Sequence, residues 1–228
     1  MPHPPTPATA RPDLDSPESA VALVTTWPVD APAGQRAVAE AVAAGGADPG
    51  TWPQGLASFT VFADSTGATV LAYTQWTSER ALAEARGGDG PDATWPPGLA
   101  ALPGAGTPAS TPFHHYRAVL GTAPADPTAL PASFPVAFFD TADRAAAEEW
   151  LDGLLASEER TEGSGRAYPG ALAAHLHISV DGRKVLSFSE WLAEEQAVAH
   201  IEAVWEPVLK EFGGTGTLYR HVGTYLRP

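Results

Sequence analysis

The chain has 228 residues, and its 27 acidic against 13 basic side chains give a formal net charge of −14 at pH 7. This length suits two domains of about 100 residues or one fused unit, and the negative charge without a basic stripe argues against nucleic acid as a partner. The absence of cysteine excludes disulfides and thiolate ligands. No run approaches the roughly 20 apolar residues of a membrane span, and the start lacks a signal-peptide apolar region. We therefore expect a cytoplasmic protein without a membrane partner.

The first half of the chain predicts one strand, one helix, one hairpin, a second helix and a final strand. Residues 1–18 are rich in Pro and Ala and predict a disordered arm. The expected elements are a strand at 21–27, a helix at 33–44 ended by Gly45 and Gly46, a hairpin at 52–76, a helix at 78–86 capped by Ser78, and a strand at 113–120. A Gly/Pro-rich loop at 87–112 is long enough to suggest a lid, a binding loop or an interaction segment, and Trp95 is its candidate lid residue.

The same order returns after a Pro-containing linker at 122–133. The expected elements are a strand at 134–139, a helix capped by Thr141, a hairpin at 168–191, a helix that Pro207 should bend or break, and a strand at 217–225. We therefore predict an N-terminal domain at 19–121 and a C-terminal domain at 134–228.

The two hairpins indicate a duplication. Residues 52–76 and 168–191 share an aromatic-Pro start, an alternating run, a Gly-containing turn, and an end at Trp76 or Trp191. In this alignment the first copy has one more residue in its turn. Each half reads βαββαβ, the ferredoxin-like arrangement. Because a four-stranded sheet with helices on one face leaves the other face bare, we predict an α+β fold of two ferredoxin-like halves packed sheet to sheet, as a dimeric α/β barrel within one chain.

The order of elements, the strand ends Thr74-Gln75-Trp76 and Ser189-Glu190-Trp191, and a helical His200 resemble the antibiotic biosynthesis monooxygenase superfamily of dimeric α/β barrels. The resemblance covers roughly residues 20–120 and 134–226. By its layout and size, the chain is also similar to the two-domain ring-opening oxygenases of angucycline pathways. This narrower resemblance implies O₂ as co-substrate and a diffusible reduced flavin, FMNH₂ or FADH₂, supplied by a separate flavin reductase. Consistent with a diffusible flavin, the chain has no G-x-G-x-x-G dinucleotide fingerprint.

Two residue patterns of the superfamily are missing from this chain, and their absence limits the reactions that the resemblance implies. Heme-degrading members use an Asn and a helical His that binds iron, whereas this chain has no Asn and carries Lys210 near the ligand position. Heme is therefore not expected. Anthrone oxygenases resemble the chain at Trp191, but their Asn and Tyr positions fall on Ser187 and Ala197. Their cofactor-free mechanism does not transfer residue by residue.

Two histidines distinguish the second hairpin from the first. His175 and His177 alternate with Leu176 and Ile178, and the aligned positions of the first hairpin are Phe59 and Val61. If the turn at Asp181-Gly182 is bulged or odd in length, period-2 geometry gathers one polar face. The residues expected on that face are His175, His177, Ser187, Ser189 and Trp191.

Two interpretations of these histidines stay open. They are either polar residues satisfied in a seam between the halves, or catalytic residues that take a proton from a phenolic substrate and hold the phenolate. Two His at i and i+2 also suit a metal, but no third ligand stands at a recognisable spacing, and we expect no metal.

The remaining candidates are substrate-binding residues. Trp76 and Trp191 are strand-end rings that either belong to the core or stack on a flat aromatic ligand. His114 and His115 point to opposite faces of a strand, so at most one of them is functional. The full set of expected substrate-binding residues is Trp191, Ser187, Ser189, His200, Tyr219, His221 and Trp76.

We predict an oxygenase that acts on a polycyclic aromatic polyketide in antibiotic biosynthesis, with O₂, a small aromatic substrate and a flavin reductase as partners. Two alternatives remain on the same fold: a polyketide cyclase, in which His175 and His177 do acid–base chemistry, and a non-catalytic small-molecule-binding protein. The chain is expected to be a monomer that forms its own pseudo-dimer, or a homodimer.

Overall fold

A computed structural model of the chain describes residues 7–8, 12, 14, 16–47, 52–87, 101–121, 130–162 and 170–226, with the side chains of 158–162 left undescribed. The chain divides into two compact units. Unit 1 contains residues 1–113 and 220–228, and unit 2 contains residues 114–219. Strands β5 (Ala109–Leu120) and β9 (Gly214–Leu226) each begin in one unit and end in the other.

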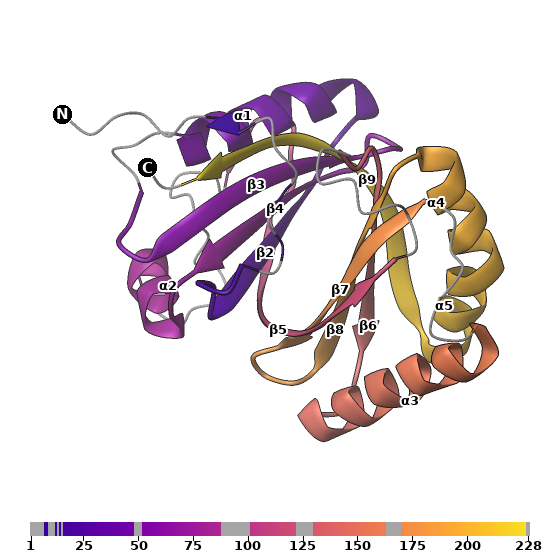
Figure 1. Cartoon of the computed structure of the whole chain (residues 1–228). Coiled ribbons are helices and arrows are strands. Elements are labelled where there is room, and N and C mark those ends of the chain that lie inside the picture. The colour runs from indigo at the N-terminus through magenta and orange to yellow at the C-terminus, as the bar shows by residue number, and fades with distance from the viewer. Residues whose placement is uncertain are drawn as a thin grey trace. The chain divides into compact units, whose positions relative to one another are not determined.

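Unit 1 holds a layer of strands with α1 (Gln35–Ala47) against one face (Figure 1). Its hydrogen-bonded order runs from the C-terminal part of β9 through β3, β4 and β2 to the first part of β5. The other elements of this unit are β1 (Pro7–Ala8), β2 (Val21–Pro28), η1 (Pro32–Gly34), β3 (Leu56–Asp64), β4 (Thr69–Trp76) and α2 (Glu79–Arg86). The helix α1 buries Val38 and Val42, which lie four residues apart on one face.

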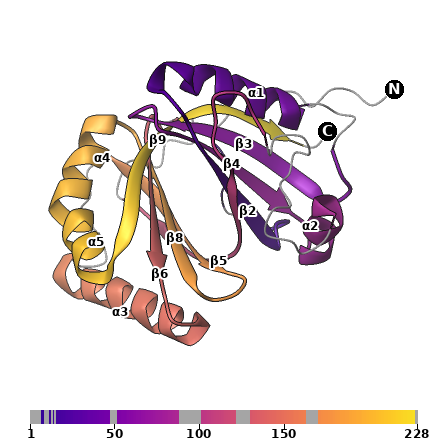
Figure 2. The same ribbon diagram turned by 180° about the vertical axis from the view of Figure 1, so that it is seen from behind.

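Unit 2 repeats this order, from the second part of β5 through β7, β8 and β6 to the first part of β9. Its other elements are β6 (Phe134–Asp140), α3 (Arg144–Glu162), β7 (Ala171–Ser179), β8 (Lys184–Trp191), α4 (Glu194–His200), the π-helix η3 (Ile201–Trp205) and α5 (Glu206–Phe212). The last three form one continuous line of helix, seen from behind in Figure 2. Leu151 and Leu155 of α3 pack on Leu176, Ile178 and Val185 of the sheet.

In both units, the strand order matches the ferredoxin-like βαββαβ arrangement. The predicted α+β fold with two ferredoxin-like halves is therefore confirmed. Among the described helices, none is long and apolar enough to cross a membrane.

Three expected helix boundaries need correction. The first helix does not stop at Gly45-Gly46 but continues to Ala47, and Gly46 serves packing instead, since a side chain there would collide with the Phe59 ring. Asp143 caps α3 by accepting a hydrogen bond from the Ala146 amide (2.9 Å), while Thr141 donates to the Gly182 carbonyl instead. Pro207 does not break the last helix, because the π-turn of η3 precedes it.

The register of the second hairpin differs from the expected one. His175 lies opposite Phe188 and His177 opposite Leu186, whereas Ser187 lies opposite Leu176. Since opposite residues of an antiparallel pair point to the same face, the predicted shared face of the two histidines with Ser187 and Ser189 is wrong. The turn between Ile178 and Val185 is not of the bulged or odd-length kind that was expected. It therefore does not bring Ser187 and Ser189 to the face of the two histidines.

The alignment of the two hairpins changes as well. Ala63 pairs with Val70 and Ile178 with Val185, so both turns have the same length. The extra residue of the first copy lies before its strand instead, between Trp52 and Gly55. Consequently the residue of unit 1 that matches His175 is Thr60, and the one that matches His177 is Phe62, not Phe59 and Val61.

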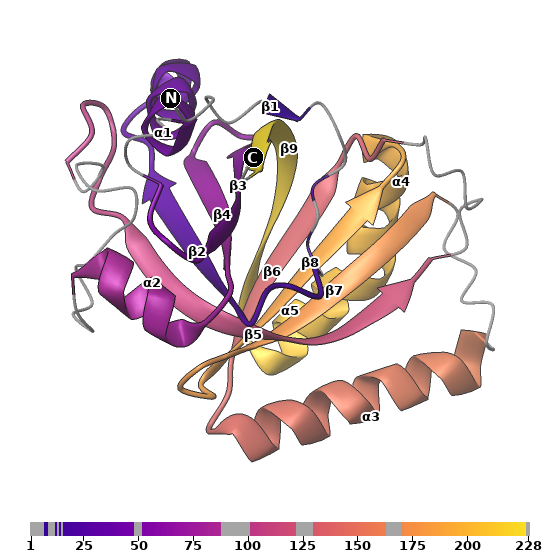
Figure 3. The same cartoon turned by 60° about the vertical axis from the view of Figure 1, so that its left-hand side comes forward.

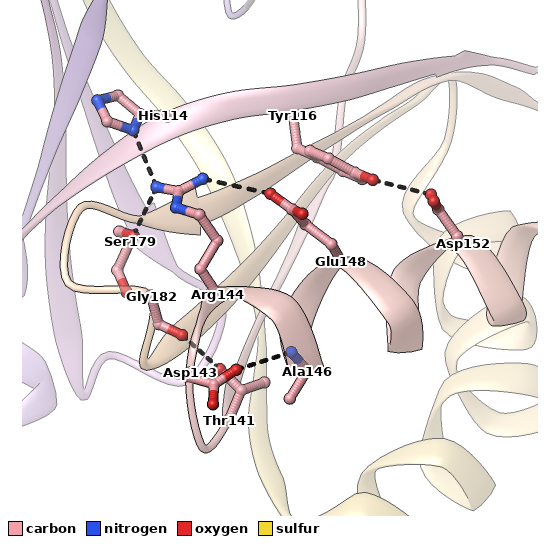
Figure 4. Close-up of polar contacts among 10 residues, drawn as sticks. All are labelled: His114, Tyr116, Thr141, Asp143, Arg144, Ala146, Glu148, Asp152, Ser179 and Gly182. Carbon is pink, nitrogen blue, oxygen red and sulfur yellow. Dashed lines mark hydrogen bonds and ion pairs between the residues drawn. The ribbon is translucent and has the colours of Figure 1, made fainter.

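Strand β5 runs alongside α3 (Figure 3), and polar contacts join its second part to this helix (Figure 4). Arg144 donates to His114 Nδ1 (3.1 Å) and lies 3.7 Å from Glu148, and the Tyr116 hydroxyl donates to Asp152 (2.9 Å). Burial first, then the Asp152 contact, raises the pKa of Tyr116 above its usual 10. With the ion pair between Arg117 and Asp152 (3.0 Å), these hydrogen bonds hold the strand against the helix.

Several predicted segments lie partly outside the described residues. Within the expected arm, Pro7 and Ala8 pair with Tyr225 and Thr224, and Leu14 is buried with its carbonyl accepting from the Tyr73 hydroxyl. Trp95 of the expected lid and residues 122–129 of the expected linker lie outside the described part of the chain.

Alanine substitutions at two glycines of unit 2 are expected to change the stability of the protein in opposite directions. Gly182 has φ +74°, and a Cβ there would lie 2.6 Å from the Arg144 amide nitrogen, whereas Gly153 in α3 has open space around it. We expect Gly182→Ala to lower the free energy of unfolding by about 1–3 kcal/mol, and Gly153→Ala to raise it by up to about 1 kcal/mol. Urea unfolding of both variants checks this, and a stabilised Gly182→Ala chain would contradict it.

Candidate functional site

A pocket of about 60 Å³ lies in unit 2 between the sheet and the α4–η3–α5 helix. Its wall is mostly aliphatic, with Leu154 and Leu155 from α3 and Leu176 from β7. The polar and aromatic groups in the wall are Ser189, Trp191, His200 and Trp205. Three of the residues predicted to bind substrate therefore meet in one place.

Trp191 is held by a short chain of hydrogen bonds. Its indole N–H donates to the Ser189 hydroxyl (3.3 Å), which donates to the Pro135 carbonyl (3.3 Å). Unit 1 repeats this device: Trp76 donates to Thr74 (2.8 Å), which donates to the Leu23 carbonyl (3.2 Å). Ser189 and Thr74 thus fix the orientation of a strand-end indole in each half.

His200 places an imidazole beside the Trp191 ring, with 4.8 Å between the ring centroids. Burial lowers the pKa of His200 from its usual 6.5 to about 4. The imidazole is therefore neutral near pH 7 and offers one acceptor nitrogen and one donor N–H. A neutral acceptor in an apolar wall suits a phenolic or enolic hydroxyl.

A second pocket, of about 240 Å³, adjoins the first and shares Ser189 and Trp205 with it. Its lining also includes Ser187, Thr217 and Glu206, so it offers more hydrogen-bonding groups than the first. Gly216 contributes to the room beside α5, since a side chain there would approach Leu209 to 2.9 Å.

His175 and His177 lie on the opposite face of the same strands and line neither pocket. Both are buried, and their neighbours on that face include His115, whose ring is 6.0 Å from His175 and 5.2 Å from His177. Glu190, fully buried, places Oε2 3.9 Å from His175 Nε2. Burial, followed by the neighbouring histidines, lowers the pKa of His177 well below 6.5. The catalytic role assigned to this pair stays a prediction without support from the pocket.

The other expected substrate-binding residues do not line these pockets. Tyr219 is buried opposite Phe134 at the end of unit 2. In unit 1, His221 contacts the Phe62 ring and Thr224 (2.8 Å), while Trp76 is fully buried. Within the described residues, no group of His, Asp and Glu side chains has the arrangement of a metal site.

Sequence reasoning missed Trp205, which lies two residues before Pro207 in the helix that this proline was expected to bend or break. It also missed the partners of the histidines, His115 and Glu190. Glu190 could have been found from its place in the strand end Ser189-Glu190-Trp191. The matching residue of unit 1 is an amide, Gln75, which accepts a hydrogen bond from the Ser58 hydroxyl (2.6 Å).

The chain matches no family model and no curated protein, but its fold occurs in solved structures. An anthrone oxidase-like protein is 16% identical and superposes with a TM-score of 0.66, over 92% of this chain and 95% of its own. A protein of Lactobacillus acidophilus described as a candidate monooxygenase is 10% identical, with a TM-score of 0.54, over 91% of this chain and 97% of its own.

A monooxygenase of Streptomyces coelicolor, ActVA-Orf6, solved in complex with nanaomycin D, is 31% identical over 48% of this chain and 98% of its own, with a TM-score of 0.41. The resemblance expected from the doubled hairpin is confirmed at the level of the fold by the anthrone oxidase-like and Lactobacillus structures. The chain has the same fold as these two proteins, with the ferredoxin-like arrangement present twice along one polypeptide.

Proposed function

We propose that this protein is an oxygenase that acts on a flat, polycyclic aromatic polyketide bearing a phenolic or enolic hydroxyl, with O₂ as the oxidant. The observation that carries the proposal is the pocket in unit 2 where the Trp191 ring and the neutral imidazole of His200 stand together in an aliphatic wall. An aromatic ring system can stack on such a wall while His200 accepts its hydroxyl proton in a hydrogen bond.

The described residues suit an oxidation in which the substrate itself supplies the electrons. A methylene between two aromatic rings becomes more electron-rich when a neighbouring hydroxyl is polarised toward its anion. Reaction of R₂CH₂ with O₂ then gives R₂C=O and H₂O, so that one oxygen atom enters the product and the other leaves as water. His200 accepts a hydrogen bond from the hydroxyl and so polarises it toward its anion, and Trp191 orients the ring plane.

A reduced flavin fits these two pockets only in part. Trp191 and Trp205 offer ring faces and Ser187, Ser189 and Thr217 offer hydrogen bonds, but neither lining contains a Lys or Arg to bind a phosphate, and Glu206 would repel one. Whether the reaction requires a reduced flavin is decided by experiment.

The test is O₂ uptake by the full chain with 1,8-dihydroxyanthrone at pH 6.5, above the uncatalysed rate, followed by appearance of the anthraquinone. A parallel reaction adds FMN, NADH and a flavin reductase, and uses a hydroxyquinone substrate. Reduced FMN consumes O₂ on its own, so the readout of the second reaction is an oxygenated product that forms only when the protein is present. An oxygenated product that depends on the protein in either reaction supports an oxygenase, and the pair tells which electron source it uses.

The variant His200→Phe keeps a ring beside Trp191 and removes the acceptor nitrogen. We expect it to lower kcat/KM by about 10- to 100-fold, the size of one lost hydrogen bond in a buried site. Conversion of a linear polyketide to a ring at the same rate without O₂ would instead identify a cyclase. Binding without any turnover would identify a non-catalytic binding protein.

A further inference from the structure

We propose that Trp205 limits the length of the ligand in unit 2, by dividing the space beneath the α4–η3–α5 helix into two compartments. The proposal rests on the proposed function only in requiring a flat aromatic ligand, and not on any reaction. Trp205 lines both pockets, and of the described residues Ser189 is the one other that does so. The two side chains therefore stand at the junction, one from the helix and one from the sheet.

The local helix geometry places Trp205 there. Residues Ile201–Trp205 form a π-turn in which the Glu206 amide donates to the Ile201 carbonyl, five residues earlier. A π-turn inserts one extra residue and rotates the helix before it relative to the helix after it. Pro207, which lacks an amide donor, comes directly after this turn. The turn thus allows the helix to continue past Pro207 with the indole directed to the junction.

The Trp205 indole packs on the hydrophobic cluster of unit 2 through its contact with Phe139. Its centroid lies 5.8 Å from the Phe139 ring, at an interplanar angle of 38°. The side chain is half-buried rather than buried, so part of the ring remains available to a ligand. A ring that packs on this cluster and remains partly exposed can act as a partition between two spaces.

The compartments differ in chemistry. The one beside His200 is lined by Val119, Leu154 and Leu155, while the one beside α5 contains Ser187, Thr217 and the Glu206 carboxylate. A ligand that reaches both would place an apolar ring in the first and hydroxyl or amine groups in the second. A ligand whose far end carries a carboxylate would be repelled by Glu206.

The test compares two probes, 1-naphthol with two fused rings and 6-hydroxy-5,12-naphthacenequinone with four, by quenching of protein fluorescence. In Trp205→Ala we expect affinity for the four-ring probe to rise at least tenfold, while affinity for the two-ring probe changes less than threefold. Trp150→Ala is the matched control, because Trp150 also packs on Phe139 (4.8 Å) but lines neither compartment. It should leave both affinities within threefold of the parent.

The inference is overturned if Trp205→Ala shows no gain for the four-ring probe, if Trp150→Ala gains equally, or if neither probe binds any of the proteins. Trp205→Leu, which removes less volume, should give a smaller gain and replaces the alanine variant if that one does not fold. The readout is equilibrium binding. A chain that shows the length effect but consumes no O₂ would therefore defeat the proposed function and leave the role of Trp205 standing.

Discussion

Replacing Trp191 with alanine is expected to lower kcat/KM for an aromatic substrate by about 10²-fold, which corresponds to about 2.7 kcal/mol. The substitution removes the ring that stacks beside His200 and leaves a void next to Ala171 and Ala197. The pocket then loses both its flat wall and the fixed position of the imidazole. O₂ uptake measures the effect, and equilibrium binding replaces it if the chain has no turnover.

Trp76→Ala is the matched control for this prediction, because Trp76 has the same place in its hairpin and the same hydrogen bond to a strand hydroxyl. Trp76 is fully buried in unit 1, so its loss should cost about 3–5 kcal/mol of stability. The affinity of the folded protein for ligand should nevertheless be unchanged. Equal losses of kcat/KM in the two variants would show that Trp191 acts through stability alone.

Acid is expected to destabilise the protein through His177. Burial, with His115 and His175 nearby, holds the pKa of His177 well below 6.5 in the folded chain, whereas the unfolded chain takes up a proton near pH 6.5. The unfolded state therefore binds more protons in this range. The stability that neutral His177 contributes is complete above about pH 6.5 and falls by up to about 1.4 kcal/mol per pH unit below it.

The variant His177→Phe copies Phe62 of unit 1 and removes this titration. Between pH 6.5 and pH 5 the parent should lose more stability than the variant, by at most about 2 kcal/mol, measured by urea unfolding at each pH. His200, with its pKa lowered to about 4, and His221, also lowered, act in the same direction in both proteins and cancel in the comparison. Parallel pH curves would show that His177 does not titrate as its burial implies.

The fold could be predicted because the duplication repeats its signals. Two alternating runs around a Gly-containing turn, each ending in Trp, are enough to place the hairpins, and Ser78 marks its helix as expected by accepting from the Ala81 amide (3.1 Å). The hairpin register could not be obtained from the aromatic starts. Tyr168 lies one residue closer to its strand than Trp52 does, and this difference was assigned to the turn.

Counting backward from Trp76 and Trp191 would have found the register, because both strand pairs have the same bulge near their open ends. Part of the candidate site could also be predicted from the sequence. Ser189, Trp191 and His200 follow from the strand end and the helix period, and they meet in the pocket. The place of Trp205 depends on a π-turn, which no 3.6-residue periodicity reveals.

The division of β9 between the units has a consequence for synthesis on the ribosome. Unit 1 contains the first and the last described strands, and Thr60 of β3 meets Thr224 (3.1 Å) only after nearly the whole chain has been translated. At about 5–20 residues per second, roughly 8–30 s separate the two residues. During that time β3 has an unpaired edge, the kind of edge that other extended chains can join. The N-terminal half of this protein therefore reaches its native sheet last, although it is made first.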